Sequence, residues 1–280
     1  MHRPRLVRFI EEHLDRKLIL ISAAAGYGKT SLLIDFAART SLPVCWYSID
    51  DTDRDPLVLL EGLRATIEHT FPGFPPAMIS TREPSAPALT DVREIVASLV
   101  RDIRLHVPER LIVILDDLHK LNGSDDANQA LGLLLQYLPS NCRLVMAGRT
   151  VPTLPLTELS AHQEVAGLGT EDLQLSAQEI QELFRGSFEL SLSDQEARQL
   201  AEQTEGWITA ILLSGSDPWK GKPPDLTQLG EHHDALFAYL GEQVFECQPQ
   251  QIRSFLERSV ILRRMSAELC DQLREADDSA

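Results

Sequence analysis

The sequence predicts an α/β fold: a doubly wound parallel sheet with helices on both faces, followed by a smaller helical region. Two observations carry this prediction. Over residues 1–168, short apolar runs typical of buried strands alternate with amphipathic helical patterns, and such alternation is typical of parallel sheets. After about residue 168 only helical patterns continue. We therefore expect a domain boundary near this residue.

The first strand and the helix after it flank a loop suited to binding phosphate. An apolar run over residues 18–22 is followed by small residues and then by a helical pattern with Leu32, Leu33 and Phe36 on its inner face. The backbone N–H groups of such a loop and the positive end of the helix point at one place. There Lys29 would contact the β- and γ-phosphates of a nucleotide, and the Thr30 hydroxyl would ligate Mg²⁺.

The loop approximates the pattern G-x-x-x-x-G-K-[ST], with Ala23 at the position of the first glycine. Alanine there requires a negative φ, whereas Gly26 and Gly28 let the backbone approach a ligand closely because they have no Cβ. A strand–helix turn without a ligand is the alternative. We expect these residues to bind the nucleotide: Ala25, Gly26, Tyr27, Gly28, Lys29, Thr30 and Ser31.

A second buried strand ends in two carboxylates. Residues 111–115 are all apolar, as in the middle of a parallel sheet, and Asp116 and Asp117 follow them. In open α/β sheets, ligands bind at the carboxyl ends of the strands. Asp116 would therefore hold Mg²⁺ together with Thr30, mostly through water, and Asp117 would orient or deprotonate an attacking water. Two solvated carboxylates at a strand end are the alternative.

The remaining elements of the alternating region follow in order. A short helix is expected near residues 5–14, a strand at 43–48, a solvated acidic loop at 50–55, and then a helix with Asp55 as its cap and Pro56 in its first turn. Five prolines between residues 71 and 88 indicate a surface loop. We expect further elements at residues 90–106 (helix), 124–138 (helix) and 143–147 (strand).

Capping signals mark the helical region. Ser176 with Glu179, and Ser193 with Glu196, are capping boxes, and a third helix begins at Gly206 and Trp207. Residues 214–230 are rich in Gly, Pro and Asp and are expected to form a linker. A helical pattern returns over residues 231–258, with an apolar face formed by Leu236, Phe237, Leu240 and Val244. Exposure of this face would favour association.

Charge and composition exclude several classes of function. The net charge is −16, although residues 1–40 carry seven Lys or Arg against four Asp or Glu, as a polyanionic ligand at the loop would require. An acidic chain is not suited to wrapping nucleic acid. No apolar run reaches the ~18 residues that span a bilayer, and the N-terminus lacks a signal-peptide core. The four cysteines form no Cys-x-x-Cys pair, so we expect reduced thiols and a cytoplasmic location.

Five short segments in this order resemble a known family. They are Ile21–Thr30, Trp46–Asp50, Leu115–His119, Ala147–Thr150 and Thr204–Trp207. The chain is similar to the large ATP-dependent LuxR-type transcription regulators, the MalT-like regulators, which belong to the STAND class of signal-transducing P-loop NTPases. The resemblance covers nearly the whole chain. Alanine commonly replaces the first loop glycine in that family.

The resemblance implies three domains and additional site residues. The domains would be a P-loop nucleotide-binding domain at residues 1–168, a helical domain at 169–228 and the start of a winged-helix domain at 229–280. Arg149 would read the γ-phosphate; a surface arginine is the alternative. Arg3 and Arg5 would lie near the base and ribose. His119 is expected to make a structural hydrogen bond, with contact at the crevice of the sheet as the alternative. Trp207 is expected to pack between domains, and a neighbourhood that reports the nucleotide state is the alternative.

The function expected from these features is a signal-transduction switch of a transcriptional regulator. It would bind ATP or ADP with Mg²⁺, hydrolyse ATP slowly at most, and self-associate in the ATP state in response to an unknown inducer. DNA would be contacted only through a C-terminal domain that this chain does not contain. One alternative is a metabolic P-loop ATPase or small-molecule kinase, with a base from the acidic loop at residues 50–55. Another is an interaction module that does not hydrolyse nucleotide.

Overall fold

A computed structural model describes residues 2–76, 91–151, 153–213, 239–246 and 248–261, and the single residues 266, 269 and 271. Most of the expected proline-rich loop, residues 71–88, lies outside the described residues. The whole of the expected linker, residues 214–230, also lies outside them, as do Leu236 and Phe237. The chain divides into two compact units, residues 1–208 and 209–280. The first unit holds the sheet and all the candidate site residues.

The sheet of the first unit has five parallel strands in the order β2-β3-β4-β1-β5. The strands are β1 (Leu18–Ser22), β2 (Val44–Ser48), β3 (Leu111–Asp116), β4 (Cys142–Gly148) and β5 (Val165–Leu168). The predicted α/β fold class is confirmed. Because β4 lies between β1 and β3, the ends of these three strands meet at one edge of the sheet.

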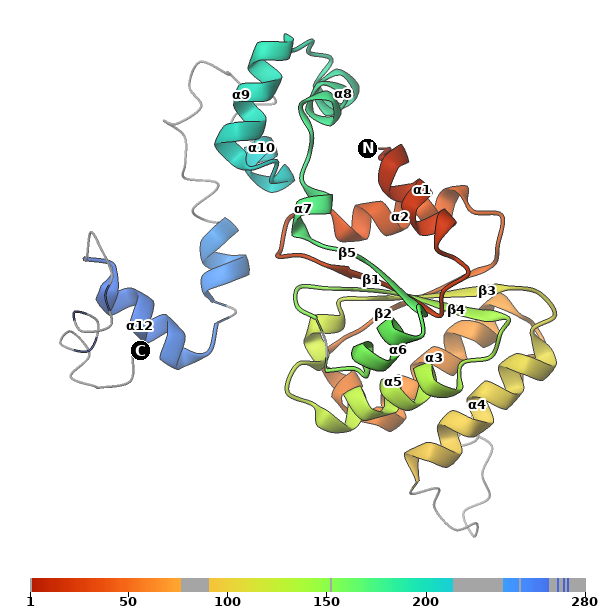
Figure 1. The fold of residues 1–280 in the computed structure, drawn as a ribbon. Helices are drawn as coiled ribbons and strands as arrows, with labels where there is room; N and C mark the ends of the chain where they lie inside the picture. Colours follow the sequence, from red (N-terminus) through yellow and green to blue (C-terminus); the bar gives the residue numbers. More distant parts are fainter. Residues whose placement is uncertain are drawn as a thin grey trace. The chain divides into compact units, whose positions relative to one another are not determined.

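Helices cover both faces of this sheet (Figure 1). One face carries α1 (Pro4–Glu12) and α2 (Lys29–Arg39), and the other carries α3 (Pro56–Thr70), α4 (Val92–His106), α5 (Asp125–Tyr137) and α6 (Leu156–Ala161). Side chains of β1 alternate between the two cores: Leu18 and Leu20 pack on one side, Ile19 and Ile21 on the other. This alternation is the period of two expected of a buried strand.

Local capping explains where several helices begin. Asp55 accepts a hydrogen bond from Leu57 N–H in front of Pro56, as predicted. Asp91 and Ser124 cap α4 and α5 in the same way. The acidic segment is more ordered than expected, because Asp51–Arg54 form the 3-10 turn η1 and Asp53 is only 1% exposed. The Tyr47 hydroxyl and the Asp50 N–H donate to Asp53, which satisfies its buried carboxylate.

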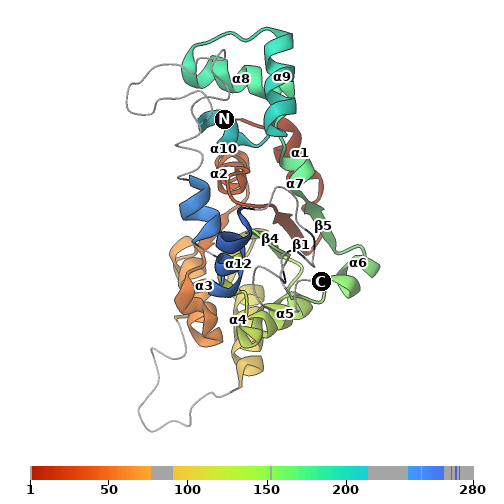
Figure 2. The same cartoon turned by 90° about the vertical axis from the view of Figure 1, so that its left-hand side faces the viewer.

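The helices after β5 are α7 (Thr170–Leu173), α8 (Ala177–Phe188), α9 (Asp194–Thr204) and α10 (Ile208–Leu213). Both predicted capping boxes are present: Ser176 with Glu179 at α8, and Ser193 with Glu196 at α9. Helices α8 and α9 lie side by side in both views (Figure 1 and Figure 2). The sequence analysis did not identify α6 or β5.

The second unit contains a π-helical turn at Gly241–Phe245 and the helix α12 (Gln250–Ser259). Val244, one residue of the expected apolar face, is 40% exposed. In the described parts of the chain, no helix is both long and apolar enough to cross a membrane.

Candidate functional site

The loop between β1 and α2 is shaped by two glycines in a left-handed conformation. Gly26 has a φ of 80° and Gly28 a φ of 77°, which side chains with a Cβ rarely adopt. Gly28 is the N-cap of α2, so the helix begins at Lys29. Ala23 does not have a positive φ, as its restricted backbone requires, and its N–H donates to the Gly148 carbonyl of β4 at 3.3 Å. The loop is therefore attached to the neighbouring strand end.

The Lys29 ammonium lies over this loop. Its Nζ donates to the carbonyl oxygens of Ala23 at 2.7 Å and Ala24 at 2.9 Å. Burial and the positive charge of Arg149 lower the pKa of Lys29, and the nearby carboxylates of Asp116 and Asp117 oppose this shift. Arg149, Asp116 and Asp117 therefore lie within electrostatic reach of Lys29.

Thr30 and Asp116 bring two oxygen donors together from different elements. The Thr30 hydroxyl in the first turn of α2 donates to Asp116 Oδ2 at the end of β3, over 2.7 Å. Asp116 is 3% exposed, and its Oδ1 accepts the Asp117 N–H at 2.9 Å. Burial raises the pKa of Asp116. A hydroxyl and a buried carboxylate beside a phosphate-binding loop fit the oxygen ligands that Mg²⁺ takes in nucleotide sites.

Asp117 and His119 extend the site beyond β3. Asp117 adopts a left-handed conformation with a φ of 60° at the start of the 3-10 turn η2 (Leu118–Leu121). Its Oδ1 lies 3.8 Å from Nδ1 of His119, beyond hydrogen-bond distance. His119 Nδ1 is buried, and the described residues offer it no hydrogen-bond partner. A buried ring nitrogen without a partner calls for an explanation, and a contact with bound nucleotide or water is one such explanation.

Arg149 follows directly after β4, the strand between the loop strand and the carboxylate strand. Its positive charge lowers the pKa of both Lys29 and His119, after the larger effect of burial. The sheet order thus brings the predicted arginine within electrostatic range of Lys29 in the loop and of His119. The sequence analysis gave His119 a lesser role, although its spacing from Asp116 and Asp117 was the available signal.

Residues after α9 reach the phosphate-binding loop. Trp207 Nε1 donates to the Ala25 carbonyl at 3.0 Å, and its ring centroid lies 6.3 Å from that of Tyr27. A Cβ on Gly28 would lie 3.9 Å from Ile208 Cγ2. Burial and the charge of Glu205 raise the pKa of Tyr27. Trp207 therefore contacts the loop directly, in addition to the packing expected of it.

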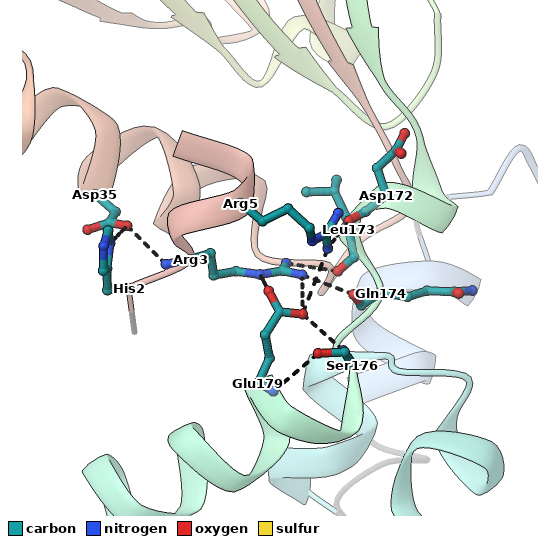
Figure 3. Close-up of polar contacts among 9 residues, drawn as sticks. All are labelled: His2, Arg3, Arg5, Asp35, Asp172, Leu173, Gln174, Ser176 and Glu179. Carbon is teal, nitrogen blue, oxygen red and sulfur yellow. Dashed lines mark hydrogen bonds and ion pairs between the residues drawn. The ribbon is translucent and has the colours of Figure 1, made fainter. Parts of the chain in front are cut away.

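Arg3 and Arg5 have other partners than expected (Figure 3). Arg3 is 5% exposed and donates to Glu179 and to two backbone carbonyls. Arg5 donates to the Asp172 carbonyl at 2.8 Å. All of these acceptors lie in residues 172–179, outside the phosphate-binding loop, so the expected position near base and ribose gains no support.

Comparison with known proteins places this chain beside one group of regulators. A family model described as the MalT winged helix domain matches residues 241–280. The HTH-type transcriptional regulator MalT of Yersinia enterocolitica is 28% identical, and that of Serratia proteamaculans 27%, each over 99% of this chain. The chain spans about 30% of the length of these relatives. The resemblance to MalT-like regulators is confirmed.

Solved structures support the fold. A Walker-type ATPase of Pyrococcus abyssi matches with a TM-score of 0.53 and 17% identity, covering 98% of this chain and 88% of that one. A STAND protein with a tetratricopeptide repeat sensor from Pyrococcus horikoshii matches with a TM-score of 0.53 and 18% identity, covering 98% of this chain and 37% of that one. This chain therefore shares the overall fold of these two proteins.

Proposed function

We propose that this chain is the nucleotide-binding switch module of a MalT-like transcriptional regulator, which binds ATP or ADP with Mg²⁺ and hydrolyses ATP slowly. One observation carries the proposal: the Thr30 hydroxyl meets the buried Asp116 carboxylate at 2.7 Å, next to the Lys29 ammonium. A turn without a ligand does not require a hydroxyl, a carboxylate and an ammonium at one sheet edge. These groups are what a phosphate chain with a bound Mg²⁺ requires.

Each part of the loop would have a distinct task. The N–H groups of residues 25–31 would hold the phosphates, because they lie at the positive end of α2. Lys29 would leave the carbonyls of Ala23 and Ala24 and donate to the β- and γ-phosphates. Thr30 and Asp116 would hold the Mg²⁺, which when bound neutralises charge on the phosphate oxygens.

Hydrolysis would depend on groups beyond β3 and β4. Asp117 would orient the attacking water and accept its proton. Arg149 would contact the γ-phosphate, since a guanidinium suits phosphate geometry. His119 Nδ1, buried without a protein partner in the described residues, would donate to or accept from the same phosphate or water. No second arginine is assigned to the transition state, and this fits slow turnover.

The switch would work by a population shift. ATP and ADP must bind two arrangements of the module with different free energies, and the arrangement favoured by ATP would self-associate. The curated relatives are named HTH-type regulators, so contact with DNA is assigned to other parts of a longer protein. The inducer is not identified. The kinase alternative has less support, because Asp50 and Asp53 make local hydrogen bonds within η1 and Asp55 caps α3.

The test is calorimetric titration of the purified chain with ADP and with ATP, each with and without Mg²⁺. Lys29→Ala is expected to abolish binding or to weaken it strongly. Lys17→Ala is the matched control. Lys17 directly precedes β1, at the end of the strand away from the loop, and its ammonium pairs with Glu164 at 2.9 Å. Equal affinity of Lys29→Ala and the parent chain would refute the site. Absence of any nucleotide binding would favour the interaction module instead.

A further inference from the structure

The N-terminal segment connects two parts of the first unit that lie far apart in the sequence. The Arg3 N–H donates to Asp35 Oδ2 on α2 at 3.2 Å. The Arg3 guanidinium donates through Nε to Glu179 Oε1 on α8 at 3.0 Å. Residue 3 therefore bridges the helix that begins at the phosphate-binding loop and the first long helix of the helical region (Figure 3).

This bridge is buried. Arg3 is 5% exposed and Glu179 8% exposed. The remaining guanidinium nitrogens donate to the carbonyls of Leu173 at 2.9 Å and Gln174 at 3.0 Å. Glu179 Oε2 in turn accepts the Ser176 N–H at 2.9 Å. A buried ion pair contributes little net stability but fixes one arrangement of its surroundings, because breaking it leaves a charge unpaired.

The backbone that Arg3 holds is packed against Gly206. The Leu175 N–H, next to the Gln174 carbonyl, donates to the Gly206 carbonyl at 2.9 Å. Gly206 has a φ of 64°, and a Cβ there would lie 2.7 Å from both the N and the O of Leu175. The position of residues 173–175 therefore determines where Gly206 and the next residue lie.

That next residue is Trp207, whose indole N–H donates to the Ala25 carbonyl of the phosphate-binding loop. A continuous series of contacts thus runs from Arg3 through Leu175 and Gly206 to Ala25. We propose that Arg3 and Glu179 are positioning residues that hold Trp207 on the phosphate-binding loop and thereby slow the release of nucleotide. The kinetic part rests on the proposed function; the positioning of Trp207 does not.

Glu179→Gln tests the pair with little change in shape. Glu196→Gln is its matched control, because Glu196 has the same place in the capping box of α9, with Ser193 as its partner. The readout of position is the fluorescence of Trp207 in a background with Trp46→Phe and Trp219→Phe, measured without nucleotide. The kinetic readout is the dissociation rate of a fluorescent N-methylanthraniloyl derivative of ADP.

Glu179→Gln is expected to make Trp207 more accessible to acrylamide and to speed release of the ADP derivative about tenfold, the effect of losing roughly one hydrogen bond. Glu196→Gln is expected to change neither. Unchanged quenching of Trp207 in folded Glu179→Gln would overturn the proposal. If quenching rises but the parent chain binds no ADP derivative, the proposed function fails and the positioning role stands.

A double-mutant cycle separates positioning from general loosening. In the chain with all its tryptophans, Trp207→Phe removes the indole N–H and should speed release to the same extent as Glu179→Gln. The double variant should be no faster than either single variant. Additive effects would contradict the proposal. If Glu179→Gln does not fold, Arg3→Lys replaces it in the cycle, because lysine keeps the charge but cannot form the forked contacts.

Discussion

The Thr30 hydroxyl and the Asp116 carboxylate form a 2.7 Å hydrogen bond that joins the first turn of α2 to the end of β3. The two residues are separated by 86 positions in the sequence. Their contact joins the phosphate-binding loop to the carboxylate strand, and it carries the proposed Mg²⁺ site.

Asp116→Asn should separate Mg²⁺ binding from nucleotide binding. The amide keeps the shape: its oxygen can accept the Asp117 N–H, and its NH2 group can donate to the Thr30 hydroxyl oxygen, but the anionic ligand is lost. Because burial already raises the pKa of Asp116, loss of the charge should not lower the melting temperature. We expect the gain in ATP affinity on adding Mg²⁺ to fall at least about tenfold, and ADP binding without Mg²⁺ to be retained. Titration calorimetry measures both; an undiminished Mg²⁺ effect would remove Asp116 from the metal site.

His119→Ala should reduce hydrolysis more than binding. The Nδ1 of His119 has no protein partner in the described residues, so its removal breaks no hydrogen bond of this nitrogen. We expect ATP turnover to fall by about 10²-fold, as for other groups that act on the transition state, with ADP affinity nearly unchanged. The control is His69→Ala on the exposed side of α3. A comparable loss of turnover in the control, or full activity of His119→Ala, would speak against this role.

Gly206→Ala should be strongly destabilising. The φ of 64° and the approach to the Leu175 backbone at 2.7 Å both oppose a Cβ. We expect the free energy of unfolding to fall by roughly 2–4 kcal/mol, measured by urea denaturation. Gly186→Ala in α8 is the matched control, since nothing lies within 4 Å of its Cβ position and alanine suits a helix interior. Equal stability of the two variants would contradict the contact between Gly206 and residues 174–175.

The Arg3–Glu179 pair should make stability depend on pH in the acid range. Burial by itself raises the pKa of Glu179, but hydrogen bonds from Arg3 and Ser176 more than reverse this, so the pKa lies below its usual 4.5. A carboxyl whose pKa is lowered on folding contributes stability above its unfolded pKa and loses it as the pH falls through the folded pKa. Stability measured at pH 7 should be about 2 kcal/mol higher in the parent chain than in Glu179→Gln.

That difference should shrink towards zero as the pH falls from the usual pKa of 4.5 through the lowered pKa of the folded state, because the parent carboxyl then binds a proton and the glutamine does not titrate. Urea denaturation of both chains between pH 7 and pH 3 measures it. A constant difference across this range would mean that Glu179 contributes through packing and not through its charge.

Much of the site was predictable because it depends on short-range chemistry. The order strand, small-residue loop and helix was predicted over residues 18–33, and β1 and α2 flank the loop as expected. The apolar run before Asp116 predicted a fully buried strand, and β3 is buried along its whole length. Ser176 and Ser193 predicted two helix starts. Each of these features is set by residues within about four positions of one another, so the sequence shows both partners.

Other features required partners that the sequence does not bring together. Arg3 was assigned to a nucleotide, but its carboxylate partner lies 176 positions away on α8. Asp53 was expected in a solvated loop, and the fold buries it against Tyr47. Trp207 was expected to pack, and its indole N–H donates to the loop carbonyl of Ala25.

The sequence by itself determined most of the elements up to β4, the loop between β1 and α2, and the two carboxylates after β3, because periodicity, glycine and capping act locally; it did not reveal α6 or β5. Only the tertiary structure decided which groups surround them. The strand order places β4 between β1 and β3, so that Arg149 comes within electrostatic range of Lys29 and His119. Packing of α8 and α9 brings Trp207 to the loop and gives Arg3 its partner. Such long-range pairs follow from the burial of whole faces, which no local pattern encodes.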